Sequence, residues 1–309
     1  MEDYKTAVFL GSKQLGLSVF KSIFLKTPNL KWIIIHPDDE LDERSKLGEF
    51  RDFAKEMGLE FLVTPSAKTT SKILIRINPD IGIVCGWYWL LEEHTLESIR
   101  GGLWGIHNSL LPKYRGGSPL VWSILEGDEF VGTTVFRISS GLDSGPILHQ
   151  IRFRIEDSDD ISTALLNIEN RLVAELPFKW FELISNKAEL TYQDEKNATF
   201  CGQRTVEDGL IEWRDNAKTI HNFIRAQAPP YPCAYSFLAG ERVEITKSKL
   251  FDGIFHGTPG QVLSRNLKSV IVSCGENTAI EILELRVGDV IKDPNQVANS
   301  IRLRFKDSY

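Results

Sequence analysis

The sequence predicts an α/β protein with a Rossmann-like, doubly wound and mostly parallel sheet, followed by a smaller C-terminal β-barrel domain of OB-like type. Two observations predict this architecture. Short apolar runs alternate with polar, helix-like stretches through the first two-thirds of the chain, and short strands with glycine turns follow a change of texture after Tyr192. We therefore expect two domains, at residues 1–192 and 203–309.

The first strands are predicted by near-continuous apolar runs, because strands covered on both faces of a parallel sheet lack polar alternation. These runs occupy residues 7–10, 32–35, 61–63 and 81–84, and helix-like spans at residues 43–57 and 68–77 lie between them. In such sheets ligands bind beyond the carboxyl ends of the strands. The short run before His107 places that residue at a strand end.

Two further strands, at residues 131–138 and 147–155, are expected to flank the loop that holds Asp143, and a long amphipathic helix is expected at residues 160–184. In the second domain, a helix at residues 216–228 ends at two prolines. Short strands follow at residues 234–238, 242–246, 261–263, 270–273 and 280–285. This order predicts a small β-barrel.

Composition limits the classes of function. The 309 residues are 42% hydrophobic and 25% charged, which is typical of a globular protein with a large core. A polar start and the lack of a long apolar run predict a cytoplasmic protein without a membrane partner. The four scattered cysteines form no CxxC pair, so we expect neither a metal site nor disulfides. A net charge of -6 disfavours nucleic acid as the main partner.

The turn after the first strand, from Gly11 to Gly16, stands where phosphate-binding loops occur. It matches neither the GxGxxG nor the GxxxxGK[ST] pattern. A tight packing turn is one interpretation. Contact of Lys13 with a substrate diphosphate is the other.

His107 and Asp143 carry the strongest chemical signal. His107 precedes a loop with Gly116 and Gly117, which allow close backbone approach to a ligand, and Asp143 lies between two glycines. A histidine alone is often a packing or surface residue, and an aspartate alone is often a turn residue. Together, a titratable ring and a carboxylate in two turn-rich loops form a candidate acid–base pair.

The segments around this pair, residues 105–116 and 140–145, resemble the active-site signature of the 10-formyltetrahydrofolate-dependent formyltransferases. Residues 207–213, 222–226 and 230–232 resemble the C-terminal domain of several members, so the resemblance covers nearly the whole chain. It implies N10-formyltetrahydrofolate as formyl donor and an amine as acceptor, with neither a metal nor a covalent enzyme intermediate. It further implies that His107 polarises the formyl oxygen, while Asp143 holds the imidazole and helps to remove the amine proton.

The resemblance also implies two sets of ligand contacts. The folate pocket is expected along an aromatic stretch and a later loop, formed by Gly86, Trp87, Tyr88, Trp89, Leu90, Leu91, Ile138, Ser139, Ser140, Gly141 and Leu142. Core packing is the alternative explanation of the aromatic residues. The substrate is expected to contact Lys13, Ser109, Tyr114, Gly116 and Gly117.

Gly105 departs from the family pattern, which has asparagine two positions before the histidine, where the amide helps to bind the formyl oxygen. Asn108 is not expected to replace it, because residues 105 and 107 share one face of an extended segment and residue 108 points to the other. Loss of one such donor costs about 3 kcal/mol of transition-state stabilisation. Another group or a water fills the gap, or the enzyme is slow, altered or inactive.

The acceptor is inferred from residues 36–44, where methionyl-tRNA formyltransferases carry a long basic loop and this chain has at least four carboxylates. Such a loop repels a polyphosphate, or it is simply a solvated surface loop. In both interpretations, this loop lacks the cluster of basic side chains that would bind the phosphates of a tRNA. We therefore expect a dTDP- or UDP-linked amino sugar as substrate, in the synthesis of a surface polysaccharide such as lipopolysaccharide O-antigen.

Three alternatives stay open. They are a methionyl-tRNA formyltransferase, a catalytically impaired homologue that binds folate or a nucleotide, and a formyltetrahydrofolate hydrolase. A homodimer also stays open, because the C-terminal domain is as suited to self-association as to substrate binding.

Overall fold

A computed structural model describes residues 4–307 of the chain, which form two compact units. The first unit comprises Met1–Gly116, Gly132–Arg152 and Leu166–Phe200, and the second comprises Gly117–Val131, Phe153–Leu165 and Cys201–Tyr309. Two internal segments thus cluster with the C-terminal part of the chain. The expected domain boundary between residues 192 and 203 stays a prediction.

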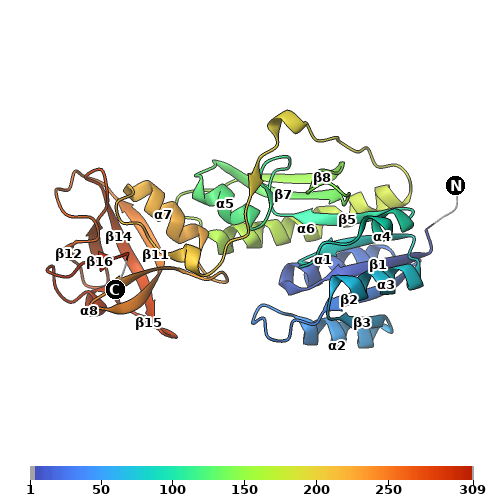
Figure 1. The fold of residues 1–309 in the computed structure, drawn as a ribbon, viewed down its shortest axis with the longest axis horizontal. Helices are drawn as coiled ribbons and strands as arrows, with labels where there is room; N and C mark the ends of the chain where they lie inside the picture. Colours follow the sequence, from blue (N-terminus) through green and yellow to red (C-terminus); the bar gives the residue numbers. More distant parts are fainter. Residues whose placement is uncertain (1–3, 308–309) are drawn as a thin grey trace. The chain divides into compact units, whose positions relative to one another are not determined.

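The first unit is built on a seven-stranded, mostly parallel sheet, as predicted (Figure 1). Its strand order is β3-β2-β1-β4-β5-β7-β8. The pairs of β1 with β2 and β4, of β2 with β3 and of β4 with β5 are parallel, whereas β7 runs antiparallel to β5. The strands are β1 (Thr6–Gly11), β2 (Lys31–Pro37), β3 (Glu60–Thr64), β4 (Ile81–Cys85), β5 (Leu103–His107), β7 (Phe130–Arg137) and β8 (Ile147–Arg154).

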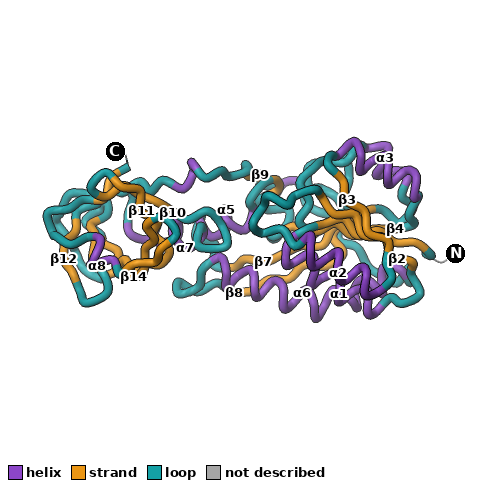
Figure 2. The backbone as a smooth tube through the Cα atoms, turned by 90° about the horizontal axis from the view of Figure 1, so that it is seen from below, coloured by secondary structure: helices purple, strands orange, loops and turns teal. Residues whose placement is uncertain are grey.

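Helices cover both faces of this sheet, with α1, α2 and α6 on one side and α3 on the other (Figure 2). Successive residues of β1 point to opposite faces. Phe9 therefore packs on Phe20 and Phe50, while Val8 and Leu10 join the apolar cluster of Leu74. The helices are α1 (Lys13–Lys26), α2 (Leu47–Met57), α3 (Ala67–Ile77), α4 (Glu93–Ser98) and α6 (Ile161–Ile184).

The expected start of α2 at residue 43 is wrong, since the helix begins at Leu47. The hydroxyl of Ser45 accepts a hydrogen bond from the Leu47 N–H at 3.2 Å and donates to Asp39 at 2.5 Å. Residues 38–46 are therefore a polar loop rather than a first helical turn.

The second unit contains a curled antiparallel sheet in the order β12-β13-β14-β11-β10-β16, with β15 paired to β14. Its core is apolar and includes Trp213, Ile245 and Phe305. The strands are β10 (Ala234–Leu238), β11 (Glu241–Phe251), β12 (Val262–Arg265), β13 (Val270–Ser273), β14 (Ala279–Val287), β15 (Val290–Lys292) and β16 (Phe305–Lys306). The helices are α5 (Pro119–Leu125), α7 (Ala217–Ala226) and α8 (Pro294–Val297). A separate two-stranded sheet is formed by β6 (Arg115–Gly116), which belongs to the first unit, and β9 (Phe200–Cys201).

Within residues 4–307, no helix is both long enough and apolar enough to cross a bilayer.

Candidate active site

His107 is the last residue of β5, at the carboxyl end of the strand, where ligands of such sheets bind. It is 8% exposed. Its main-chain oxygen accepts hydrogen bonds from the Ser109 N–H at 2.8 Å and from the Thr133 hydroxyl at 3.2 Å. These contacts fix the backbone from which the imidazole projects.

The imidazole ring of His107 lies between two acceptors. Its Nε2 is 2.7 Å from the carbonyl oxygen of Tyr114, and its Nδ1 is 3.6 Å from Oδ2 of Asp143. A carbonyl oxygen accepts only, so Nε2 carries a proton in this arrangement.

Asp143 sits in a tight turn that brings its carboxylate to the ring. Its φ of +46° is a left-handed conformation that residues other than glycine rarely adopt. The Gly116 N–H donates to Oδ2 at 2.9 Å. A Cβ at Gly145 would lie 1.8 Å from the Arg137 carbonyl oxygen, so only glycine allows this close approach. The structure thus brings His107, Asp143, Tyr114 and Gly116 together.

The face of β5 beside His107 is apolar at the position where asparagine was expected. A Cβ at Gly105 would lie 3.0 Å from Cε1 of Phe136 and 3.2 Å from Cγ1 of Ile138. These two side chains fill the space of the missing amide. Oδ1 of Asn108 accepts a hydrogen bond from the Thr133 hydroxyl at 3.0 Å.

The two segments expected to bind folate meet at one apolar cluster. Trp87, Leu91 and Ile138 all pack against the cluster of Val8, Leu10 and Leu103. Nε1 of Trp87 is buried and has no hydrogen-bond partner among the described residues. Tyr88, Leu90 and Leu142 are exposed by 45%, 87% and 49%. An apolar wall with an unused donor suits a flat heterocycle with polar edges.

The remaining residues of this stretch support its shape. Gly86 adopts a φ of +69° against the main chain of Ser12, and Trp89 packs edge-on against Trp87 with ring centroids 5.3 Å apart. In the later loop, Ser139, Ser140 and Gly141 are exposed. Packing therefore accounts for Gly86, Trp87 and Trp89, but not for the exposed residues 139–141 of the predicted folate pocket.

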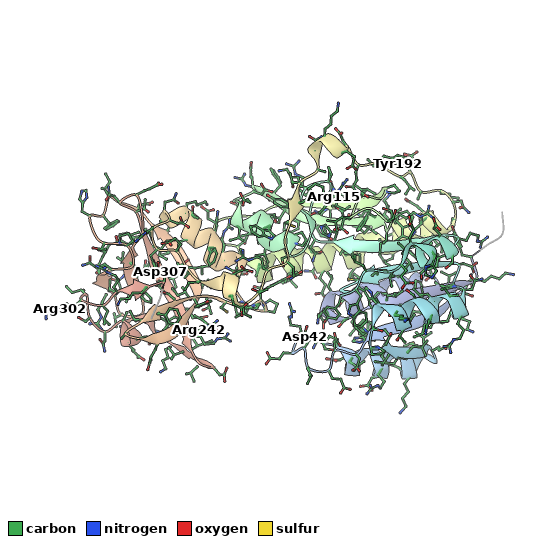
Figure 3. All side chains as sticks on the ribbon, viewed as in Figure 1. Asp42, Arg115, Tyr192, Arg242, Arg302 and Asp307 are labelled. Atoms are coloured by element: carbon green, nitrogen blue, oxygen red, sulfur yellow. The ribbon has the colours of Figure 1, made fainter. Side chains whose placement is uncertain are left out.

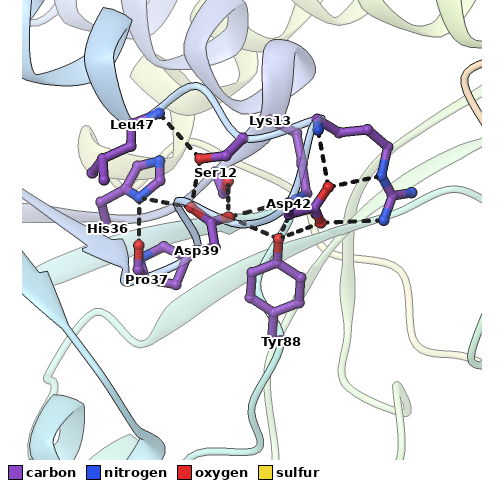
Figure 4. Close-up of polar contacts among 10 residues, drawn as sticks. Ser12, Lys13, His36, Pro37, Asp39, Asp42, Leu47 and Tyr88 are labelled. Carbon is purple, nitrogen blue, oxygen red and sulfur yellow. Dashed lines mark hydrogen bonds and ion pairs between the residues drawn. The ribbon is translucent and has the colours of Figure 1, made fainter.

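Lys13 is tied to the acidic loop of residues 38–46 rather than left open (Figure 4). Its Nζ lies 2.5 Å from Oδ2 of Asp42 and 3.5 Å from Oδ2 of Asp39, and it also bonds the Tyr88 hydroxyl. That hydroxyl lies 2.8 Å from Asp39 and 3.1 Å from Asp42. The glycines of this turn serve packing, since a Cβ at Gly11 would lie 2.2 Å from the Cys85 carbonyl oxygen.

The ionisation of this cluster follows from its contacts. Burial opposes the charged form of Asp42, but hydrogen bonds from Lys13 and Arg44 outweigh it and hold the pKa of Asp42 below its usual range. Burial likewise opposes ionised Asp39, but hydrogen bonds from two serines and Tyr88 lower its pKa. Burial, and then the two carboxylates, raise the pKa of Tyr88. Both aspartates are therefore carboxylates at neutral pH.

The other predicted substrate contacts have structural partners. Ser109 is 1% exposed, and its hydroxyl donates to the Lys113 carbonyl oxygen at 2.7 Å. The Gly117 N–H donates to the Cys201 carbonyl oxygen at 3.1 Å. These contacts shape the loop that carries Tyr114 and Gly116.

Sequence reasoning included Arg115 only as part of the candidate loop of residues 113–117 and missed Gln193, and the two side chains bond each other beside this loop. Arg115 lies between two predicted contact residues, and that position was a usable signal. Gln193 lies in a polar stretch without a recognisable pattern.

Comparison with known proteins gives matches along most of the chain. The family model described as "Formyl transferase" matches residues 63–175, and the one described as "Formyl transferase, C-terminal domain" matches residues 204–302. A methionyl-tRNA formyltransferase of Caldanaerobacter subterraneus is 30% identical over 289 residues, which cover 90% of this chain and 91% of that protein.

Solved structures share the fold at lower identity. A sugar 3N-formyl transferase, WlaRD, crystallised with dTDP and 5-N-formyl-THF, is 18% identical with a TM-score of 0.69, over 92% of this chain and 98% of that one. An N-formyltransferase of Helicobacter canadensis, in complex with folinic acid and dTDP-3-aminofucose, is 18% identical with a TM-score of 0.69, over 90% and 99% of the two chains.

Proposed function

This chain belongs to the formyltransferase family, and we propose that it transfers the formyl group of N10-formyltetrahydrofolate to the primary amine of a dTDP- or UDP-linked amino sugar. Formyl transfer follows from the family. The donor, the acceptor and the residue roles are the proposal. The proposal rests mainly on His107, which ends β5 and whose Nδ1 lies 3.6 Å from the carboxylate of Asp143.

In the proposed reaction, the acceptor nitrogen forms a bond with the formyl carbon, and the bond from that carbon to N10 breaks. The acceptor nitrogen loses one proton and N10 gains one. His107 stabilises the negative charge on the formyl oxygen, and Asp143 keeps the ring oriented and charged. Because Nε2 already donates to the Tyr114 carbonyl, the formyl oxygen must share or replace that contact.

Because position 105 has no side-chain amide, His107 must supply more of the stabilisation of the negative charge on the formyl oxygen. Phe136 and Ile138 offer no donor to the formyl oxygen. They do exclude water, and an apolar environment strengthens the attraction between an imidazolium and a developing oxyanion. A charged His107 is therefore the proposed oxyanion donor of this enzyme.

The donor pocket is proposed along residues 86–91 and 138–142. The buried and unpartnered Nε1 of Trp87 supports it, as do the exposed apolar side chains of both segments. The neighbours crystallised with 5-N-formyl-THF and with folinic acid share this fold.

The amino-sugar acceptor is supported by the charge of residues 38–44. The loop holds five carboxylates, and Lys13 and Arg44 are both paired with Asp42. The remaining negative charge repels a long polyanion more strongly than a small diphosphate. The neighbours whose structures hold dTDP or dTDP-3-aminofucose agree with this choice. We propose Tyr114, Gly116 and Gly117 as acceptor contacts.

Methionyl-tRNA is the second candidate acceptor. The observation in its favour is the 30% identity with a methionyl-tRNA formyltransferase over 91% of that protein.

A single assay separates these candidates. Purified protein and N10-formyltetrahydrofolate are incubated with dTDP-linked amino sugars, UDP-linked amino sugars, methionyl-tRNA or no acceptor, and the products are identified by mass spectrometry. Formylation of a nucleotide sugar supports the proposal, and formylation of tRNA alone overturns the acceptor. Formate release without an acceptor indicates a hydrolase, and folate binding without any product indicates an impaired homologue.

A further inference from the structure

Arg115 is a buried cation that the proposed reaction does not use. It is 2% exposed, although it lies in the loop that reaches the active-site pair. Its Nη1 and Nη2 bind the two carboxylate oxygens of Glu195 at 2.8 and 2.7 Å. Its Nε and Nη2 bind Oε1 of Gln193 at 3.2 and 2.9 Å. A guanidinium held by four such hydrogen bonds is fixed in both position and orientation.

The residues on either side of Arg115 are the ones that contact the pair. The Tyr114 carbonyl oxygen binds Nε2 of His107 at 2.7 Å, and the Gly116 N–H donates to Oδ2 of Asp143 at 2.9 Å. The same loop is tied to the strap of residues 191–200, because the Tyr114 N–H and the Arg115 N–H bind the hydroxyl and the carbonyl oxygen of Thr199. Fixing Arg115 therefore fixes one contact to each member of the pair.

Gln193 completes the connection from the other side. Its Oε1 accepts from Arg115, and its Nε2 donates to the main-chain oxygens of Asp143 and Gly145, both at 2.8 Å. Asp143 has a φ of +46°, a left-handed conformation that aspartate adopts more readily than most residues. The two hydrogen bonds from the amide of Gln193 hold the main chain of this turn.

We infer that Arg115 and Gln193 are positioning residues for formyl transfer, which hold the His107 imidazole and the Asp143 carboxylate at the distance and angle that the reaction needs. The inference rests on the proposed roles of His107 and Asp143. Neither Arg115 nor Gln193 contacts the imidazole or carboxylate directly in the hydrogen bonds described. They act through the Tyr114–Gly116 loop and the Asp143 turn.

Gln193→Glu tests the connection with little change in size. The variant keeps an acceptor for Arg115, but it loses both N–H donors and places a carboxylate against two carbonyl oxygens. We expect kcat to fall about 10- to 100-fold, as for other residues that orient catalytic groups, while KM for donor and acceptor changes less than about 3-fold. We also expect the pH profile of kcat to change, because the Asp143 turn that faces the ring of His107 loses two hydrogen bonds.

Gln193→Asn and Arg171→Gln complete the design. Gln193→Asn retains both amide groups on a shorter side chain, so it should recover part of kcat. Arg171 likewise binds a carboxylate and a main-chain oxygen, those of Glu175 and Arg152, and Arg171→Gln should leave kcat and its pH profile unchanged. Thermal unfolding of each variant shows that the protein remains folded at the assay temperature.

Two results would overturn the inference: a folded Gln193→Glu enzyme with the kcat and pH profile of the parent, or a rise in KM alone. His107→Ala in the same assay keeps the two proposals separate. If that variant is as active as the parent, the proposed role of His107 fails, and the positioning inference fails with it. If it is inactive while Gln193→Glu is normal, only the positioning role fails.

Discussion

Two polar clusters of the first unit lie at carboxyl ends of strands in the same sheet. In one the charged side chain is neutralised by carboxylates of the chain, and in the other the imidazole Nε2 meets only a neutral main-chain oxygen among the described residues. At the end of β5, one imidazole faces a carboxylate and a main-chain oxygen. Beyond β1 and β2, Lys13 is held by Asp42 and Asp39. Asp42 and Arg115, one residue from each region, lie at separate places in the unit (Figure 3).

The difference shows that a charged side chain at a strand end is open to a ligand only if the chain's own carboxylates do not already neutralise it. Lys13 stands where a phosphate contact was expected, but its charge is balanced by the chain's own carboxylates. A phosphate must displace Asp42 to reach it. His107 has no such strong competitor, because a neutral carbonyl oxygen is the only partner of its Nε2 in the hydrogen bonds described. We therefore propose the end of β5 as the reactive cluster.

The largest expected effect is the loss of the pair itself. His107→Ala removes the proposed oxyanion donor and should lower kcat by about 10²- to 10⁴-fold. Asp143→Asn keeps the size of the side chain but removes its charge, and it should lower kcat less. Steady-state kinetics with N10-formyltetrahydrofolate measures both. Circular dichroism should show unchanged folding, and parental turnover by either folded variant would remove that residue from the mechanism.

A smaller effect is expected when the missing amide is restored. Gly105→Asn combined with Ile138→Val provides a donor and removes Cδ1 of Ile138, which lies 3.3 Å from a Cβ at position 105. We expect kcat to rise by up to about 10²-fold, because one oxyanion donor contributes about 3 kcal/mol.

Two controls separate chemistry from packing in that experiment. Gly105→Ala adds a Cβ without a donor and should cost about 1 kcal/mol of unfolding free energy with no gain in kcat. Ile138→Val alone measures the effect on folate binding. If the folded double variant shows no rise in kcat, an amide at position 105 does not reach the reacting oxygen.

The smallest expected effect concerns the acidic loop. Asp42→Asn should lower the free energy of unfolding by about 1 kcal/mol at neutral pH, because it weakens the contacts to Lys13 and Arg44. The pKa of Asp42 is depressed in the folded protein, so this stabilisation is present above the unfolded value near pH 4 and is lost as the pH falls through the folded value. Urea denaturation of parent and variant from about pH 7 to about pH 3 should show the difference shrinking in acid.

The same variant tests whether the loop masks Lys13. With the carboxylate neutralised, affinity for inorganic triphosphate should rise about 5-fold at low salt. Glu182→Gln is the matched control, since it alters a Lys–carboxylate pair of similar length, 2.9 Å, on α6. Equal affinities for parent and Asp42→Asn would mean that Lys13 is not a latent phosphate contact.

The sequence by itself determined the sheet and the candidate pair of His107 and Asp143. Residues 7–10, 32–35, 61–63 and 81–84 lie within β1 to β4, because continuous apolar runs between helices have few other ways to be buried. His107 and Asp143 were found from the glycines and turns around them. Their nearness was predicted from resemblance, and the structure places them 3.6 Å apart.

Only the tertiary structure decided which polar groups neutralise one another. The pairing of Lys13 with Asp42, the filling of the Gly105 space by Phe136 and Ile138, and the link from Arg115 through Gln193 to Asp143 all join residues far apart in the chain. Periodicity records which face of an element is apolar, and it carries no information on which distant side chain meets that face. The candidate pair was therefore predictable from the sequence, whereas the contacts that hold it in place were not.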